Sequence, residues 1–400
     1  MTVADRLVGL NAEERAALAA RIARHLPEPL VSVFDPDLMC SHLLFDEFVH
    51  RLILQVCAET GLAAAASAWS TVEEIVVRRG FDPAHATVAV GSMLGHLAAR
   101  GVVARNDGRF RADGGWPTPD PAEVRAEQQR HDPACRPSYV VAETVARDYP
   151  AFLSGQRSGE DILLATSRLP LWVAYFSNDN PLYAVNNRVG AVAVETWRPR
   201  TPGTILEIGG GCGSGTAALL ERLHAVGRLG EARAYRFTEL VPAFLRRGER
   251  VVRERFPDLP GLSFEILDMN RAFDEQGIAP ASVAAVYAVN TLHVAHDLAF
   301  TLGEVRRALE PGGRLIVSEC VRPFAGQTLY PEFIFNLMST FRAPLLHPEY
   351  RPNGGFLTID QWTAALTAGG FRDVRVLPDV ESIRDLFPTF YAAALGATRA

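Results

Sequence analysis

The hydrophobic and polar positions of the chain follow different patterns in its two halves. From Thr204 onward, short apolar runs that suit strands buried on both faces alternate with segments that carry apolar residues at helical spacing. This alternation predicts an α/β fold with a doubly wound parallel sheet and right-handed crossovers. A sixth strand is expected over 371–377 and a last one over 390–395. The first five predicted strands end at Glu207, Glu239, Asp268, Asn290 and Glu319.

The first half of the chain predicts helices. They are expected after Asn11, over 45–62, from a capping box of Thr71 and Glu74, and over 84–99. Two β-like runs around Asn106-Asp107-Gly108 then predict a hairpin, which makes this region winged-helix-like. The predicted domains are an N-terminal helix (1–30), a helical winged-helix-like domain (31–115), a linker with helices (116–168) and the sheet domain (169–400) with a lid (169–197) and a cap (324–357).

Five glycines follow the first strand of the predicted sheet. They allow positive φ and leave no Cβ that would keep a ligand away from the backbone. The helix that begins near Thr216 offers its unpaired N–H groups at the same place, so the turn is predicted to bind a ligand. The glycines of this turn are Gly209, Gly210, Gly211, Gly213 and Gly215.

The acid at Glu207, two residues before the first glycine, narrows the class of ligand. A glycine turn alone also fits nicotinamide and flavin folds. The form Glu-x-Gly-x-Gly-x-Gly resembles class I S-adenosylmethionine (SAM)-dependent methyltransferases, whose sheet is Rossmann-like. A carboxylate here would repel a pyrophosphate, whereas it suits a ligand with an ammonium and a sulfonium group. The resemblance implies SAM as the cofactor.

The polar strand ends suggest how the cofactor would be held, because ligands of such sheets bind at the carboxyl ends of the strands. Glu239 is expected to accept hydrogen bonds from the ribose hydroxyls. Asp268 is expected to meet the adenine amino group, with Met269 against the ring. The predicted cofactor-binding residues are Glu207, Gly209, Gly211, Gly213, Glu239, Asp268, Met269 and Asn290.

A histidine and a glutamate after the fourth and fifth strands suggest the chemistry. Neighbouring strands of a sheet lie about 5 Å apart, so His293 and Glu319 are predicted to meet above the sheet. A carboxylate would orient the imidazole and support its protonated form, as a general base requires. The competing interpretation of His293 is a core or capping histidine. His296 is expected on the surface.

The same residues resemble the C-methyltransferase domains of polyketide synthases. The resemblance rests on Asn290-Thr-Leu-His293, on the spacing to Glu319 and on the segment 333–371, and it covers roughly 169–395. In those domains a His–Glu pair deprotonates the α-carbon of a β-ketoacyl thioester. The resemblance therefore implies C-methylation of a natural-product intermediate, with His293 as base and Glu319 as its partner. The acceptor would be a small molecule or bound to a carrier protein.

Aromatic and asparagine side chains gather just before the glycine turn, in 169–197. Because buried amides need hydrogen-bond partners, we interpret this segment as a helical lid over cofactor and acceptor. Aromatic residues at near-helical spacing in 333–341 are candidates for the roof of the acceptor site, although core packing explains them equally well. The predicted acceptor-binding residues are Trp172, Tyr175, Tyr183, Asn187, Phe335 and Met338.

Four other functions stay open from the sequence. The enzyme could methylate a phenol oxygen, or an alkene carbon of a prenyl diphosphate, although the arginines show no diagnostic diphosphate cluster. A protein of another class could bind SAM without transferring its methyl group, or act as a scaffold in a biosynthetic pathway; the pair of His293 and Glu319 argues against this. A nicotinamide dehydrogenase is disfavoured by Glu207.

Composition limits the partners. The net charge is -6, from 40 basic and 46 acidic residues, so no basic excess points to nucleic acid. The helix before the hairpin, around Met93, is also nearly uncharged. A similar winged-helix-like module precedes the catalytic domain of many small-molecule methyltransferases, where it dimerises and roofs the substrate. We therefore expect a homodimer interface rather than a DNA-binding surface.

Composition also limits the chemistry and the compartment. All 40 basic residues are arginines, which excludes Schiff-base and pyridoxal chemistry based on lysine. The five cysteines are scattered and contain no Cys-x-x-Cys pair, so we expect no metal site and no disulfide framework. No apolar run approaches the roughly eighteen residues of a membrane span, and no signal peptide is evident. The expectation is a reduced, cytoplasmic, soluble protein.

Overall fold

The computed structural model of the chain describes residues 9–112, 116–117, 119–197, 202–259 and 261–400. These residues form two compact units. The helical unit comprises the described residues within 1–16, 36–175 and 324–342. The sheet unit comprises those within 17–35, 176–323 and 343–400. The predicted lid and the predicted cap are each divided between the two units, after residue 175 and after residue 342.

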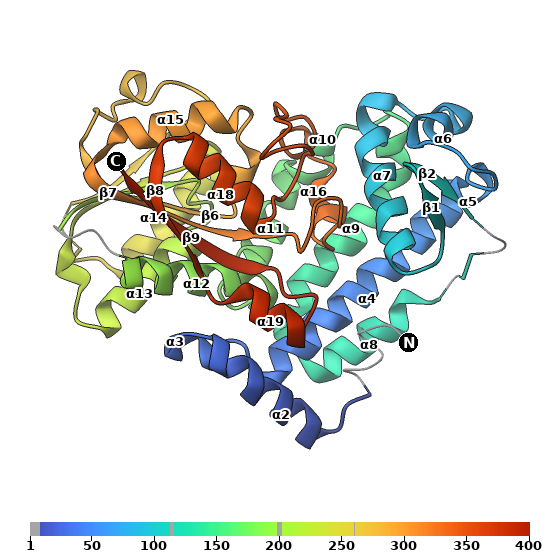
Figure 1. The fold of residues 1–400 in the computed structure, drawn as a ribbon, viewed down its shortest axis with the longest axis horizontal. Helices are drawn as coiled ribbons and strands as arrows, with labels where there is room; N and C mark the ends of the chain where they lie inside the picture. The colour runs from blue at the N-terminus through green and yellow to red at the C-terminus, as the bar shows by residue number, and fades with distance from the viewer. Residues whose placement is uncertain (1–8, 113–115, 118, 198–201, 260) are drawn as a thin grey trace. The chain divides into compact units, whose positions relative to one another are not determined.

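A seven-stranded sheet in the order β5-β4-β3-β6-β7-β9-β8 forms the centre of the sheet unit (Figure 1). The pairs β3–β4, β3–β6, β4–β5 and β6–β7 are parallel, whereas β9 runs antiparallel to both β7 and β8. This arrangement confirms the predicted doubly wound α/β class. The strands are β3 (Gly203–Ile208), β4 (Ala232–Thr238), β5 (Leu262–Glu265), β6 (Val283–Val289), β7 (Leu309–Cys320), β8 (Phe371–Leu377) and β9 (Ala392–Arg399).

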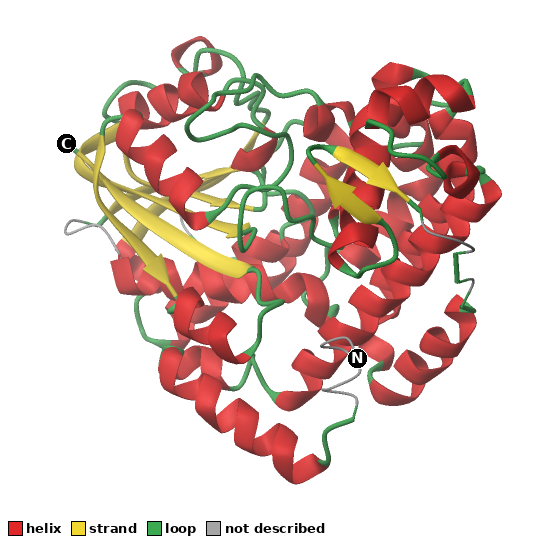
Figure 2. Ribbon diagram, turned by 45° about the vertical axis from the view of Figure 1, so that its right-hand side comes forward, coloured by secondary structure: helices red, strands yellow, loops and turns green. Residues whose placement is uncertain are grey.

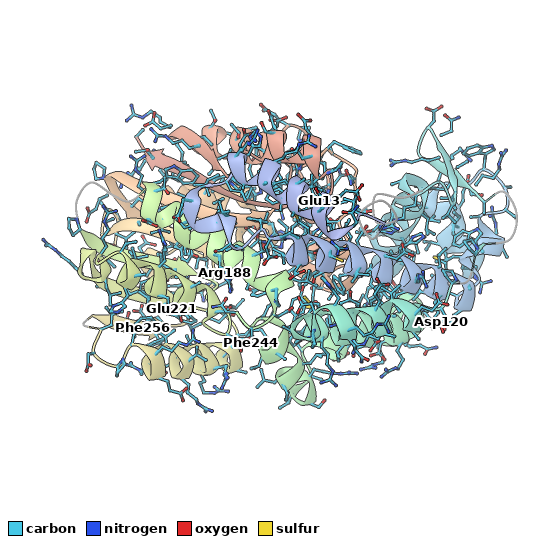
Figure 3. The ribbon with its side chains drawn as sticks, turned by 90° about the horizontal axis from the view of Figure 1, so that it is seen from below. Glu13, Asp120, Arg188, Glu221, Phe244 and Phe256 are labelled. Atoms are coloured by element: carbon cyan, nitrogen blue, oxygen red, sulfur yellow. The ribbon has the colours of Figure 1, made fainter. Side chains whose placement is uncertain are left out.

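Helices cover both faces of this sheet. One face carries α12 (Pro181–Trp197), α13 (Ser214–Ala225) and α14 (Pro242–Arg255), and the other carries α15 (Leu298–Ala308) and α18 (Ile359–Ala368). Figure 3 shows the first face from outside, with Arg188, Glu221 and Phe244 labelled on its three helices. Every residue of β6 is buried, as expected for a central strand with helices on both sides.

Close packing of α12 on the sheet depends on one glycine. A Cβ at Gly190 would lie 2.7 Å from the hydroxyl of Tyr287 and 3.0 Å from Cβ of Ser318. The absence of a side chain therefore lets the helix approach β6 and β7. This contact fixes the position of the segment that precedes the glycine-rich turn.

The helical unit contains one two-stranded hairpin among its helices (Figure 2). The hairpin follows α7, and Asp107 and Gly108 at its turn have φ of 47° and 73°. The elements are α4 (Pro36–Glu59), α5 (Leu62–Ala65), α6 (Val72–Arg79), α7 (Pro83–Ala99), β1 (Ala104–Asn106), β2 (Arg109–Arg111), α8 (Pro121–His131), α9 (Arg136–Leu153), α10 (Gly159–Leu163), α11 (Leu169–Tyr175), α16 (Glu332–Phe335) and α17 (Ser339–Arg342).

The remaining helices are short or lie at the edge of the sheet unit. They are α2 (Ala12–Ile22), α3 (Glu28–Val31) and α19 (Val380–Leu386), with 3-10 turns at η1 (Ala23–His25), η2 (Pro133–Cys135), η3 (Thr166–Arg168), η4 (Leu229–Glu231), η5 (Asp274–Gln276) and η6 (Leu292–Val294). None of the helices in the described part of the chain is long and apolar enough to cross a bilayer.

Local signals of the sequence are confirmed where side chains cap a helix. Thr71 with Glu74 and Thr358 with Gln361 both form complete capping boxes. Three element boundaries are corrected. The third strand of the sheet, β5, ends at Glu265 rather than at Asp268, the last strand is β9 rather than 390–395, and the helix expected over 45–62 is α4, which begins at Pro36. Residues 113–115 of the predicted winged-helix-like domain and residue 118 of the predicted linker lie outside the described residues. The predicted domain limits stay predictions.

Candidate active site

The glycine-rich turn joins β3 to α13 and is shaped by what surrounds it. Gly209, Gly211 and Gly213 have φ of 67°, 57° and 86°, a region that L-residues with side chains rarely adopt. A Cβ at Gly209 would lie 2.4 Å from Cγ2 of Thr291. A Cβ at Gly211 would meet no described atom within 4 Å. Gly211 therefore has the same kind of backbone as its neighbours but adjoins open space, where a ligand can reach the main chain.

Glu239 follows β4 and holds this turn in place. One carboxylate oxygen accepts a hydrogen bond from N–H of Gly211 at 2.9 Å, and the other accepts from N–H of Val241 at 2.8 Å. Burial raises the pKa of Glu239, while these backbone N–H groups act against that rise. Each oxygen keeps a second lone pair, so the carboxylate can anchor the turn and accept further hydrogen bonds from a ligand.

Glu207 lies inside β3 and is 2% exposed. Its Oε2 accepts hydrogen bonds from the hydroxyls of Thr216 at 2.5 Å and Tyr235 at 2.9 Å. Burial raises the pKa of Glu207 to about 7, which the two hydroxyls oppose. Among the described residues no basic side chain pairs with this carboxylate. A cation supplied by a ligand would therefore stabilise its charged form.

Two asparagines connect α12 to the same turn. Asn187 is fully buried and donates to Oδ1 of Asn178 at 2.8 Å, and Asn178 donates to the main-chain oxygen of Ser214 at 2.8 Å. Oδ1 of Asn187 has no hydrogen-bond partner among the described residues. A Cβ on Gly215 would be 3.5 Å from this oxygen and 3.3 Å from Oε1 of Glu207. Asn187 was predicted to bind the methyl acceptor, but it lies beside Glu207, which was predicted to bind the cofactor.

Asn290 links the ends of β6 and β7. It has φ of 47°, and its Oδ1 accepts from N–H of Cys320 and from the Asn186 amide, both at 3.0 Å. The amide of Asn186 also donates to Sγ of Cys320 at 3.1 Å. These hydrogen bonds hold Asn290 in its positive-φ conformation, at the point where the chain leaves β6 and turns towards His293.

Asp268 and Met269 lie three and four residues beyond β5 and are half-buried. Oδ1 of Asp268 accepts from N–H of Asn270 at 2.9 Å, and the main-chain oxygen of Met269 accepts from Thr301 at 3.0 Å. The strand ends early because the segment after it turns back through the amide of Gln276, which donates to the main-chain oxygen of Asp268 at 2.9 Å. The predicted adenine contacts are therefore loop residues.

His293 and Glu319 meet as predicted. Nδ1 of His293 lies 2.7 Å from Oε2 of Glu319, and the two residues are 5% and 0% exposed. Oε1 of Glu319 accepts from the main-chain N–H groups of Thr291 at 3.2 Å and Leu292 at 3.0 Å. A carboxylate that accepts from Nδ1 selects the tautomer whose other ring nitrogen, Nε2, is the basic atom. The turn η6 and the end of β7 thus hold an oriented imidazole.

Two further side chains at this histidine were missed by the sequence analysis. The ring of Phe356 packs on the imidazole with centroids 4.6 Å apart, and the guanidinium of Arg351 donates to the main-chain oxygen of His293 at 2.5 Å. Both follow His293 by more than fifty residues. No local motif predicts such long-range contacts. The available signal was Arg351 itself, which lies in a segment of Pro and Gly that is typical of a turn.

Of the predicted acceptor residues, three pack together in the helical unit. Trp172 stacks on Phe335 with centroids 6.2 Å apart, and Tyr175 approaches both rings, at 5.7 Å from Trp172 and 6.3 Å from Phe335. Met338 lies half-buried between α16 and α17. Tyr183, like Asn187, belongs to α12 of the sheet unit, and burial raises its pKa. The roles of all these residues stay predictions.

Residues 206–315 match a family model described as a methyltransferase domain. Highly reducing polyketide synthase 2 of Gibberella zeae is 33% identical over 243 residues, which cover 59% of this chain and 9% of that synthase. The polyketide synthase PksM of Bacillus subtilis is 25% identical over 261 residues, or 63% of this chain and 6% of the synthase. The chain thus spans less than a tenth of the length of these curated relatives.

Solved structures have the same fold. The CurJ carbon methyltransferase is 21% identical with a TM-score of 0.77, and the match covers 96% of this chain and 99% of that one. The C-methyltransferase (CMeT) domain of the citrinin polyketide synthase is 17% identical with a TM-score of 0.71, over 98% of each chain.

Residues 206–315 thus carry a domain of the methyltransferase class, and the sheet topology is the fold of the solved carbon methyltransferase. SAM is its cofactor, and the residues fit it, because the buried carboxylate of Glu207, which has no cationic partner in the described part of the chain, adjoins a turn with open space at Gly211. Within this class the chain resembles the C-methyltransferase domains of polyketide synthases.

The glycine turn yields a first prediction from two matched variants. Gly209→Ala and Gly211→Ala both place a side chain at positive φ, which costs roughly 1–2 kcal/mol. Only Gly209→Ala also creates a clash, with Thr291. We expect Gly209→Ala to lower the free energy of unfolding more, and Gly211→Ala to lose more SAM affinity per kcal/mol of lost stability. Urea unfolding and calorimetric titration measure the two; equal ratios of lost affinity to lost stability would contradict the assignment of Gly211.

Glu207 yields a prediction about pH. Its pKa is raised by folding, so its contribution to stability is present below the ordinary value of 4.5 and is lost as pH rises through about 7. A cationic ligand favours the charged carboxylate, so SAM affinity should rise with pH over this range, by at most about tenfold per unit. Calorimetry between about pH 5.5 and about pH 7.5 tests this, below the titration of the SAM amino group. Glu207→Gln should flatten the profile; an unchanged slope in this variant would refute the role of Glu207.

Proposed function

We propose that the protein is a C-methyltransferase that methylates an activated carbon of a natural-product intermediate such as a β-ketoacyl thioester. The observation that carries this proposal is the buried pair of His293 and Glu319, 2.7 Å apart at the ends of neighbouring parallel strands. The printed description of CurJ as a carbon methyltransferase supports the choice of carbon. Its acceptor would be a small molecule or bound to a carrier protein.

In the proposed reaction His293 is the general base. Nε2 accepts the proton from the acceptor carbon, whose C–H electrons become an enolate that spreads onto the neighbouring carbonyl oxygens. Glu319 holds the imidazole by Nδ1 and balances the positive charge that the proton brings. SAM supplies an electrophilic methyl group on a sulfonium. When bound, it would give this methyl group to the enolate carbon and leave as S-adenosylhomocysteine, which would keep the electrons of the broken S–CH₃ bond.

The acceptor class follows from what such a base can do. A neutral imidazole removes protons efficiently only from acids whose pKa lies within a moderate distance of its own, and a carbon between two carbonyl groups meets this condition. In the proposal Glu207, Glu239 and the glycine turn hold the cofactor.

A transfer assay with labelled SAM separates the candidates. Methyl incorporation would be measured by mass spectrometry on β-ketoacyl thioesters, carried by pantetheine or by a carrier protein, on phenols and on prenyl diphosphates. The proposal expects incorporation into the β-ketoacyl compounds. Incorporation only into phenols or prenyl diphosphates would replace it with one of those activities. Binding of SAM without transfer to any acceptor would favour a non-transferring or scaffold role.

A further inference from the structure

A turn in the segment 343–357 carries an arginine that is 1% exposed. His347 and Arg351 exchange two main-chain hydrogen bonds of 2.9 Å each, and the ring of His347 stacks on Tyr350 with centroids 3.8 Å apart. Both ends of the turn are thereby held in place. We refer to residues 343–357 as the strap.

The guanidinium of Arg351 forms hydrogen bonds with the main chain around His293. Nη1 donates to the main-chain oxygen of Ala295 at 2.6 Å, and Nη2 donates to that of His293 at 2.5 Å. These carbonyls end the one-turn helix η6, whose last carbonyl groups lack partners within the helix. A planar fork with two parallel N–H groups holds both at once, which a single ammonium cannot do. Phe356 of the same strap packs on the imidazole.

The positive charge of Arg351 is buried inside the protein. Burial lowers its pKa to about 10, and the nearby acids Asp297 and Glu319 and the hydroxyl of Tyr350 act in the opposite direction. The guanidinium therefore stays protonated at neutral pH. Among the described residues no carboxylate lies within ion-pair distance of it, so its charge is balanced at longer range by Glu319 and Asp297. A buried cation of this kind is costly unless the fold uses it.

We propose that Arg351 is a positioning residue of the methyl transfer, one that fixes the main chain at His293 and brings a positive charge to the loop that carries the imidazole. The proposal rests on the function proposed above. The carboxylate of Glu319, from β7, contacts the imidazole, and the guanidinium of Arg351, from the strap, contacts the main chain of the same residue. Asp297 at the start of α15 and Tyr350 of the strap complete the titratable groups on this side.

The test is the pH dependence of kcat/KM in two variants. Arg351→Met removes the positive charge and both hydrogen bonds. Arg351→Lys keeps the charge, but its ammonium cannot donate to both carbonyl oxygens in the same geometry. We expect the acidic limb of the Arg351→Met profile to move to higher pH by about one unit, because a neighbouring charge shifts such equilibria on this scale. In Arg351→Lys the limb should stay where it is in the wild type, with kcat lowered and KM for SAM unchanged.

Arg384 provides a matched control. Its buried guanidinium also donates to carbonyl oxygens, those of Phe390 at 2.9 Å and Val321 at 2.8 Å, and burial lowers its pKa to about 10 as well. Arg384→Met should lower stability and leave the acidic limb in place. A limb that moves equally in Arg384→Met and Arg351→Met would show a general effect of instability and would overturn the proposal.

Other outcomes distinguish this proposal from the proposed function. If His293→Ala abolishes transfer while Arg351→Met lowers the rate with an unmoved limb, Arg351 is structural only and this proposal fails alone. If His293→Ala retains full turnover, both fail. Circular dichroism verifies folding. If Arg351→Met does not fold, Arg351→Lys decides, because a limb displaced in that charge-retaining variant contradicts the proposal and an unmoved limb supports it.

Discussion

Replacing His293 by alanine is expected to slow methyl transfer by about 10²- to 10⁴-fold, the range that a positioned general base contributes. The imidazole is held by Glu319 at 2.7 Å and has no substitute on the same turn. Affinity for SAM should stay unchanged, because the described contacts of the glycine turn involve Glu207 and Glu239 rather than this histidine. Single-turnover kinetics with labelled SAM, together with calorimetric titration, measure the two quantities separately.

His296 is the matched control for this experiment. It lies three residues further along the same loop, its side chain is exposed, and its main-chain groups bond to Asn270 and Leu345. His296→Ala should therefore transfer methyl groups at the wild-type rate. Equal losses in the two variants would mean that the loop, and not the imidazole of His293, matters. If His293→Ala kept full activity, the assignment of His293 as the general base would be wrong.

The second large effect is expected on cofactor affinity. Glu239→Ala should weaken SAM binding by about 10- to 100-fold, since hydrogen bonds to a charged group contribute roughly 1.5–3 kcal/mol. The variant also leaves the N–H groups of Gly211 and Val241 without their carboxylate partner, which loosens the turn. Calorimetric titration of SAM and of S-adenosylhomocysteine measures this loss, which should be similar for both.

Glu265 offers the comparison for Glu239. It ends the neighbouring strand β5, but hydrogen bonds from Arg236, with one from Ser263, lower its pKa despite burial. The carboxylate of Glu265 is thus occupied by hydrogen bonds from side chains of the protein itself. Glu265→Gln should leave SAM affinity nearly unchanged. If Glu239→Ala bound SAM as tightly as Glu265→Gln, the assignment of Glu239 to the cofactor would have to be abandoned.

The sheet and the ends of its strands could be predicted because they follow from local patterns. A buried parallel strand needs an apolar run, and ligands bind where such strands end, so Glu207, Glu239 and Glu319 are recognisable in the sequence. The meeting of His293 with Glu319 follows from the spacing of neighbouring strands. Asp268 was predicted to end the third strand of the sheet, but it lies three residues beyond β5, because Gln276 turns the chain back after this strand.

Contacts made across long stretches of chain could not be predicted. Arg351 donates to the main-chain oxygen of His293 over a separation of 58 residues, and no local motif near either residue specifies that they meet. The same holds for the stacking of Trp172 on Phe335. The predicted lid appeared continuous in sequence, yet the turn before Pro181 divides it into α11 and α12, which belong to different units.

The central claim is that the methyl group is transferred to carbon. The most direct measurement uses SAM with a ¹³C-labelled methyl group and a β-ketoacyl thioester with ¹³C at the α-position, followed by NMR of the product. We predict a methyl resonance split by direct coupling to the labelled α-carbon, absent with His293→Ala. A methyl resonance at the chemical shift of an ether or ester, without that coupling, would show transfer to oxygen and contradict the account.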